Sequence, residues 1–160
     1  MSPEAGAIID LAKTAGVTLA TAESLTGGLV CASLVSAPGA SAVVRGGIVA
    51  YNTAVKISAL GVSPILIERE GPVAHAVALA MARGALKALG ADVAVATTGV
   101  AGPEPHGGCE PGTAVIAVVG PESHRVKTVH IEGNRDDVMD EAVSVALEEL
   151  TQVLQRMAPR

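Results

Sequence analysis

The spacing of hydrophobic positions predicts that helices and strands alternate along this chain. Helices are expected where apolar residues recur every three or four positions, and strands where Val, Ile and Ala run together. The expected helices are residues 3–15, 27–36, 53–60, 63–69, 73–89 and 135–157. The expected strands are residues 17–22, 43–51, 92–98, 113–119 and 125–131.

Residues that favour helix ends support several of these boundaries. Ser2 suits the N-cap of the first helix, with Pro3 at its first position. The pair Ser63-Pro64 can open the fourth helix in the same way, and Asn134 can cap the last one.

The order of the elements predicts an α/β fold. The continuous apolar run over residues 92–98 suits a central strand that is buried on both faces. The last two strands are separated by a short segment that begins Gly120-Pro121, which predicts a late antiparallel hairpin. Because helices and strands alternate before this hairpin, we expect a mixed sheet with helices on both faces.

Size and composition favour one compact domain. The chain has 160 residues, of which 49% are hydrophobic and 17% charged, so we expect a single domain over residues 1–160. Its mean hydropathy is +0.47, yet no stretch reaches the roughly 20 apolar residues of a membrane helix, and no membrane partner is expected. The N-terminus does not have the basic region of a signal peptide. Two cysteines do not make a disulfide framework, so we expect a reducing, cytoplasmic location.

Charge and aromatic content argue against nucleic-acid binding. The chain has no Trp, no Phe and one Tyr, and its net charge is −5. Proteins that bind single strands stack bases on aromatic rings, and phosphate backbones attract basic surfaces. Nucleic acid is therefore not an expected partner.

The first candidate for chemistry is residues 21–28, Thr-Ala-Glu-Ser-Leu-Thr-Gly-Gly, at a strand-to-helix junction. Backbone amides at a helix start favour negative charge. Ser24 can therefore act as a nucleophile there, with nearby amides holding an oxyanion. The alternative is an ordinary helix start with Ser24 or Thr26 as the N-cap.

The second candidate is residues 46–51, Gly-Gly-Ile-Val-Ala-Tyr, followed by Lys56. A lysine can serve as a general base if burial or positive neighbours lower its pKa from about 10.4 toward 7–8. The alternative is that Tyr51 packs at the sheet edge and Lys56 is solvated. No Gly-x-Gly-x-x-Gly follows the first strand, so a dinucleotide-binding fold is not expected.

The third candidate is residues 97–103, Thr-Thr-Gly-Val-Ala-Gly-Pro, directly after the predicted central strand. Ligands of open α/β sheets bind beyond the carboxyl ends of strands, and these glycines can expose amides to a phosphate or an oxyanion. An ordinary strand-end loop is the alternative.

Two further sites are considered. Arg135 can bind a phosphate or be solvated. His106 and Cys109 are too few ligands for a structural zinc site, so no metal is expected.

Together these segments resemble one family. Thr-Ala-Glu-Ser-x-Thr-Gly-Gly at 21–28, Gly-Gly-x-Val-x-Tyr at 46–51 with Lys56, and Thr-Gly-x-Ala-Gly-Pro at 98–103 occur in this order in the C-terminal domain of the competence/damage-inducible protein CinA. The same domain occurs alone as a nicotinamide-nucleotide amidase. The resemblance runs from about residue 5 to residue 155.

The resemblance implies a three-layer α/β/α sandwich with a mixed, mainly parallel sheet. It implies hydrolysis of nicotinamide mononucleotide (NMN) to nicotinate mononucleotide and ammonia in pyridine-nucleotide salvage, without a cofactor. The matching positions make Ser24 the nucleophile, Lys56 its base and Tyr51 an assisting residue. A homo-oligomer is expected from the high hydropathy. The expected substrate-binding residues are Thr26, Gly27, Gly28, Arg45, Thr98, Gly99, Gly102 and Arg135.

The sequence also departs from the family pattern. Leu25 stands where the family has Cys, Ala74-His75 replaces Ser-Glu, and Asn52-Thr53 replaces Ser-Asn. The loop over residues 104–110 is atypical and is expected near the site. Two other functions stay open: a non-catalytic nucleotide-binding or regulatory module of the same fold, and an amidase or esterase for another small substrate.

Overall fold

The computed structural model describes residues 3–157. The strands are β1 (Leu19–Glu23), β2 (Val44–Val49), β3 (Val93–Gly99), β4 (Thr113–Val119) and β5 (His124–His130). The helices are α1 (Pro3–Ala15), α2 (Leu29–Val35), α3 (Thr53–Leu60), α4 (Pro64–Glu70), α5 (His75–Leu89) and α6 (Arg135–Met157), and a short 3₁₀ turn, η1, covers Ala40–Ala42. Each predicted element is present within a few residues of its expected bounds.

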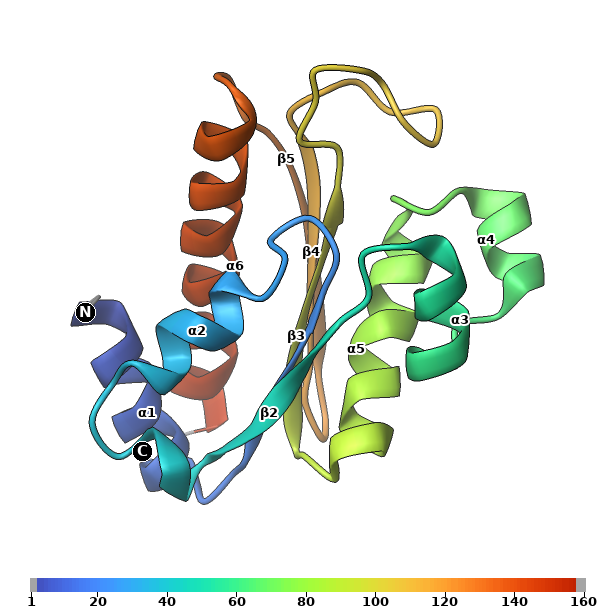
Figure 1. Ribbon diagram of the computed structural model, residues 1–160. Helices are drawn as coiled ribbons and strands as arrows, with labels where there is room; N and C mark the ends of the chain where they lie inside the picture. The colour runs from blue at the N-terminus through green and yellow to red at the C-terminus, as the bar shows by residue number, and fades with distance from the viewer. Residues whose placement is uncertain (1–2, 158–160) are drawn as a thin grey trace.

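The five strands form one mixed sheet in the order β2-β1-β3-β4-β5. β1 pairs in parallel with β2 and β3, whereas β4 is antiparallel to both β3 and β5. Only β4 therefore runs against the other strands, and the late hairpin is confirmed. Helices α1, α2 and α6 cover one face of the sheet, and α3, α4 and α5 lie on the other, which gives three layers (Figure 1).

Strand periodicity decides which residues face which layer. Side chains of a strand alternate between the two faces, so β1 sends Leu19 into the core beneath α1 and α6 and Ala20 and Ala22 into the core beneath α5. The aliphatic cores on both faces are built mainly from Ala, Val, Leu and Ile. Because so many of these residues are small, helices can pack close to the sheet.

Side-chain caps confirm two predicted helix starts. The Ser63 hydroxyl accepts a hydrogen bond from the Leu66 amide at the start of α4. The Asn134 side chain accepts from the amides of Asp136 and Asp137 at the start of α6. The predicted cap at Ser2 lies outside the described residues. Across residues 3–157, no helix combines the length and apolar character needed to cross a membrane.

Candidate active site

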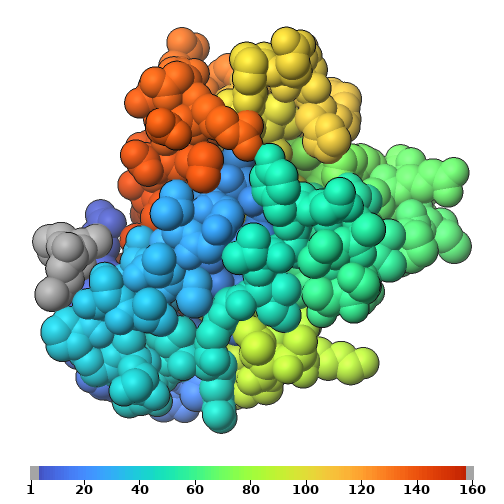
Figure 2. Space-filling model, viewed as in Figure 1, coloured from blue at the N-terminus to red at the C-terminus, as the bar shows by residue number. Residues whose placement is uncertain are grey.

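A cleft of about 320 Å³ opens beyond the carboxyl ends of β1 and β3. In Figure 2 the segments around it meet at the upper part of the molecule, with the start of α6 in orange, the loop after β3 in yellow and the start of α3 in teal. This is the edge at which open α/β sheets bind ligands. The cleft is lined by Ser24, Leu25, Tyr51, Asn52, Thr53, Lys56, Val73, Gly99, Val100, Ala101, Gly102, Glu104, His106 and Arg135.

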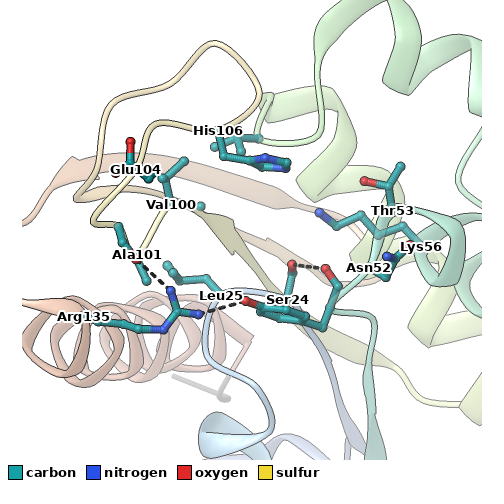
Figure 3. A pocket seen from close by; sticks show the side chains of 14 residues that line it. Ser24, Leu25, Asn52, Thr53, Lys56, Val100, Ala101, Glu104, His106 and Arg135 are labelled. Atoms are coloured by element: carbon teal, nitrogen blue, oxygen red, sulfur yellow. Dashed lines mark hydrogen bonds between the residues drawn. The ribbon is translucent and has the colours of Figure 1, made fainter.

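Ser24 is the first residue after β1, and its side chain reaches the cleft. Its amide donates to the carbonyl of Thr97 at 2.9 Å, which ties the turn to β3. Its Oγ donates a long hydrogen bond of 3.4 Å to the backbone carbonyl of Tyr51. The serine is only 6% exposed, so its hydroxyl is held at the base of the cleft and is available to a bound molecule (Figure 3).

Lys56 lies on α3 and points into the cleft (Figure 3). The residue is 3% exposed, and its Nζ donates to Thr98 Oγ1 at 3.3 Å and to the Pro72 carbonyl at 3.4 Å. No carboxylate in residues 3–157 forms an ion pair with it. Burial therefore lowers the pKa of Lys56 to about 8. At pH 7 about a tenth of the lysine is then neutral, and this form can act as a general base.

Arg135 connects two walls of the cleft. Its Nη1 donates to the Gly102 carbonyl and its Nη2 to the Tyr51 hydroxyl, each at 2.8 Å. The Tyr51 hydroxyl therefore faces the guanidinium of α6, while the Tyr51 carbonyl holds Ser24. The role of Tyr51 as an assistant to the Ser24–Lys56 pair stays a prediction.

The expected substrate-binding residues fall into three groups. Gly99, Gly102 and Arg135 line the cleft. Thr98 lies behind Lys56, because its Oγ1 accepts from Nζ and donates to the Pro72 carbonyl at 2.8 Å. The remaining residues do not line the cleft, and their substrate contacts stay predictions: Thr26, Gly27, Gly28 and Arg45.

The start of α2 differs from the sequence-based expectation of a Ser24 or Thr26 cap. Gly28 is the residue before the helix and supplies no side-chain cap. The carboxylate of Glu23 accepts instead from the amides of Val30 and Cys31, at 2.8 and 2.9 Å. The N-cap alternative is therefore wrong: a side chain from the preceding strand binds the first free amides of this helix.

Sequence reasoning did not assign roles to several residues of the cleft wall. Glu104 and His106 belong to the loop over residues 104–110, which the sequence marked only as unusual, and His106 was otherwise considered only as a metal ligand. This loop is held by reciprocal backbone hydrogen bonds between His106 and Cys109, and the imidazole of His106 lies across the cleft from Ser24 (Figure 3). Val73 carried no signal, because an apolar residue in a turn looks the same whether or not it lines a cleft.

Comparison with known sequences assigns the family. The sequence profile of the CinA C-terminal domain matches residues 2–154. The chain belongs to the CinA C-terminal domain family. A CinA-like protein of Frankia casuarinae is 44% identical over 149 residues, which are 93% of this chain and 34% of the relative. One of Mycobacterium marinum is 46% identical over 140 residues, 85% of this chain and 32% of the relative. The chain thus spans about a third of these relatives.

Solved structures of CinA proteins have the same fold. A CinA superfamily protein from Escherichia coli aligns with a TM-score of 0.91 at 32% identity, over 94% of this chain and 88% of that chain. The competence/damage-inducible protein from Agrobacterium tumefaciens aligns with a TM-score of 0.79 at 34% identity, over 97% of this chain and 99% of that chain. The α/β architecture expected from the sequence is therefore confirmed.

Proposed function

We propose that this CinA-family chain hydrolyses the carboxamide of nicotinamide mononucleotide, releasing nicotinate mononucleotide and ammonia. The observation that carries the proposal is the meeting in one cleft of Ser24 and a buried Lys56 that has no acidic partner among residues 3–157. An amine in that position can accept a proton near neutral pH, and a serine beside it can attack an acyl carbon.

The reaction begins when Ser24 Oγ attacks the carboxamide carbon and its proton passes to Lys56 Nζ. The two side chains share no hydrogen bond in the described structure, and catalytic hydrogen bonds commonly tighten only when substrate binds. The C–N bond then breaks as Lys56 returns the proton to the leaving nitrogen, which departs as ammonia. Water, with Lys56 again as base, hydrolyses the ester on Ser24 to the carboxylate product.

The oxyanion formed in the attack needs hydrogen-bond donors. Leu25 directly follows Ser24 and lines the cleft, and its amide makes no hydrogen bond within residues 3–157. The Gly27 amide, by contrast, donates to the Ser24 carbonyl. In serine hydrolases the amide after the nucleophile commonly serves the oxyanion, so we assign Leu25 this role in the proposed mechanism.

Arg135 supports recognition of the substrate's phosphate. A guanidinium has five N–H donors, of which Arg135 uses one on Gly102 and one on Tyr51. The remaining donors can bind phosphate oxygens within the same cleft as Ser24. A local cation is required because the chain carries a net charge of −5 and would otherwise repel an anionic nucleotide.

The test is ammonia release from NMN by the purified protein, with the product identified by mass, beside Ser24→Ala. The wild type is expected to form nicotinate mononucleotide, and Ser24→Ala to lose at least roughly 1,000-fold in kcat because the nucleophile is gone. Near-wild-type turnover by a folded Ser24→Ala protein would contradict the assignment.

The atypical loop favours a second candidate, an amidase for another small substrate. Glu104 and His106 place a carboxylate and an imidazole on the cleft wall, and such groups change which amide fits. A panel of pyridine and aliphatic carboxamides separates the two candidates. A folded protein that turns over no amide would instead favour the binding-module alternative. The homo-oligomer, the cytoplasmic location and the single-domain organisation stay predictions.

A further inference from the structure

We infer that Glu23 is a positioning residue, whose buried carboxylate fixes the turn that presents Ser24 to the substrate. The inference rests on the proposed role of Ser24 as nucleophile. Glu23 is the last residue of β1 and is 1% exposed. It does not line the cleft, and the proposed chemistry does not use it.

Four hydrogen-bond donors converge on the Glu23 carboxylate. Oε1 accepts from Thr26 Oγ1 at 2.6 Å and from the Val30 amide at 2.8 Å. Oε2 accepts from Thr21 Oγ1 at 3.0 Å and from the Cys31 amide at 2.9 Å. These contacts join β1, the turn after Ser24 and the start of α2, so a single side chain holds both ends of the turn.

The chemistry of this site requires a carboxylate. Each oxygen faces one backbone N–H, which can only donate. In a glutamine, one of the two oxygens becomes an NH₂ group, and that group would face an N–H donor whichever way the amide is turned. The site therefore distinguishes Glu from Gln, although the two side chains have nearly the same shape.

Strand alternation explains how Glu23 acts on Ser24 without entering the cleft. Consecutive side chains at the end of β1 leave on opposite faces, so Glu23 points toward α2 and Ser24 toward the cleft. The neighbouring strand repeats the pattern. Thr97 contacts Thr26 at 2.8 Å on the Glu23 side, whereas Thr98 contacts Lys56 on the cleft side. The turn at Ser24 is thus held by contacts on the α2 face of the sheet, opposite to the face that carries the cleft.

The negative charge of Glu23 interacts with the start of α2 and not with Lys56, the proposed general base. The lowered pKa of Lys56 is caused by burial, and the Glu23 oxygens are already engaged by their four donors. The first free amides of α2 are consequently occupied by a group of the protein itself. Removal of the carboxylate should therefore displace Ser24 while leaving the titration of Lys56 unchanged.

The experiment compares Glu23→Gln with Glu149→Gln, a second buried carboxylate that lies on α6 away from the cleft. Two readouts are taken: kcat and KM for NMN, and the rate at which a fluorophosphonate probe labels Ser24, followed by mass. Folding is monitored by circular dichroism, because the chain has no Trp. The labelling rate reports the position of Ser24 whether or not NMN is the substrate.

Glu23→Gln is expected to lower kcat and the labelling rate together by about 10- to 100-fold, since misplacement by about 1 Å can cost that much. KM should stay within about twofold, and the pH midpoint of the labelling rate should not move. Glu149→Gln is expected to label at the wild-type rate. If the wild-type protein is labelled at Ser24 but does not turn over NMN, NMN is not the substrate. The role of Glu23 is then tested by the labelling rates of the variants alone.

If Glu23→Gln does not fold, Thr26→Val removes the shortest of the four hydrogen bonds, together with the contact between Thr26 and Thr97, and keeps the carboxylate. It should slow labelling of Ser24 several-fold in a folded protein. The inference is overturned if folded Glu23→Gln or, failing that, folded Thr26→Val labels at the wild-type rate. It is equally overturned if the wild-type Ser24 does not react, because no nucleophile is then being positioned.

Discussion

The contact between β5 and α6 and the cleft at the ends of β1 and β3 each bury a charged side chain, but they do so differently. Glu149 on α6 accepts from Arg125 Nε at 2.8 Å and lies 3.4 Å from Lys127 Nζ. Burial by itself would raise the pKa of Glu149, but the two cations outweigh it and lower that pKa. Lys56 is equally buried, and its hydrogen-bond acceptors among the described residues are two neutral oxygens.

The difference separates a buried charge that is paired with opposite charges from one that is not, and we propose that the second serves catalysis. A buried ion stabilised by opposite charges stays ionised at neutral pH and joins two elements of the fold. A buried amine without a counter-ion makes the protonated folded state less stable, and such arrangements concentrate at sites of proton transfer. Variants at the two places should therefore change different properties, and each is measured for both activity and stability.

Lys56→Met should give the largest effect, because it removes the general base and the uncompensated charge together. We expect a loss of about 1,000-fold in kcat. Stability should rise, because the pKa falls from 10.5 in the unfolded chain to about 8 in the folded protein. The protonated form therefore costs folding about 3 kcal/mol below pH 8, and this cost disappears as pH rises toward 10.5.

Lys87→Met is the matched control, because Lys87 is exposed on α5. It should change the free energy of unfolding by less than about 0.5 kcal/mol and leave turnover intact. Denaturant unfolding of the three proteins at pH 7 and pH 10 gives the comparison. A Lys56→Met protein that is less stable than wild type at pH 7 would contradict the view that Lys56 is a destabilising charge.

The pH dependence should follow the same lysine. Since Lys56 must be neutral to accept the Ser24 proton, kcat/KM for NMN should rise about tenfold per pH unit below pH 8 and level off above it. The rise between pH 6 and pH 8 would then be about 50-fold. Steady-state rates from pH 6 to pH 9.5 test this, and a flat profile over that range would exclude Lys56 as the base.

Glu149→Gln should act on stability alone. Replacing the carboxylate removes the charge that Arg125 and Lys127 share, at an expected cost of about 2 kcal/mol in the free energy of unfolding. The lowered pKa of Glu149 stabilises the folded protein at pH values above the unfolded pKa of 4.5. This stabilisation is lost as pH falls below 4.5 through the folded pKa, so the free energies of unfolding of wild type and Glu149→Gln should converge there. A kcat changed by more than about twofold would show that the two regions are coupled.

The smallest effects should come from two arginines that differ in their partners. Arg135→Ala should raise KM for NMN about tenfold and leave KM for nicotinamide riboside nearly unchanged, since only NMN carries the phosphate. Arg125→Ala should reduce stability without changing either KM, because Arg125 pairs with Glu149. Equal KM changes for both substrates in Arg135→Ala would remove the phosphate contact from the proposal.

Local sequence patterns were sufficient for the secondary structure. The predicted helices over residues 3–15 and 53–60 match α1 and α3 at both ends, because caps and helical spacing depend on residues within a few positions of one another. The start of α2 was the exception. Its cap is Glu23, which lies in the preceding strand, and a carboxylate that reaches across a turn from a strand is not a recognised helix-start pattern.

The candidate site was only partly accessible to sequence reasoning. The strand-end motifs and the family resemblance identified Ser24, Tyr51 and Lys56, and the structure brings all three to one cleft. Glu104 was expected only as part of an unusual loop, and His106 was considered besides only as a metal ligand. Their place in the wall depends on how that loop packs, as shown by Gly107, where a Cβ would lie 2.7 Å from Pro72.

The sequence by itself determined the order of helices and strands and the mixed sheet, and it indicated Ser24 and Lys56 as candidates for acyl chemistry. Only the tertiary structure decided that Lys56 is buried without a counter-ion, that Thr98 serves this lysine, and that Glu23 occupies the start of α2. The reason is physical: burial and pairing are set by contacts between segments far apart in the chain, such as Lys56 with Thr98, 42 residues away. The spacing of residues along the sequence does not predict such contacts.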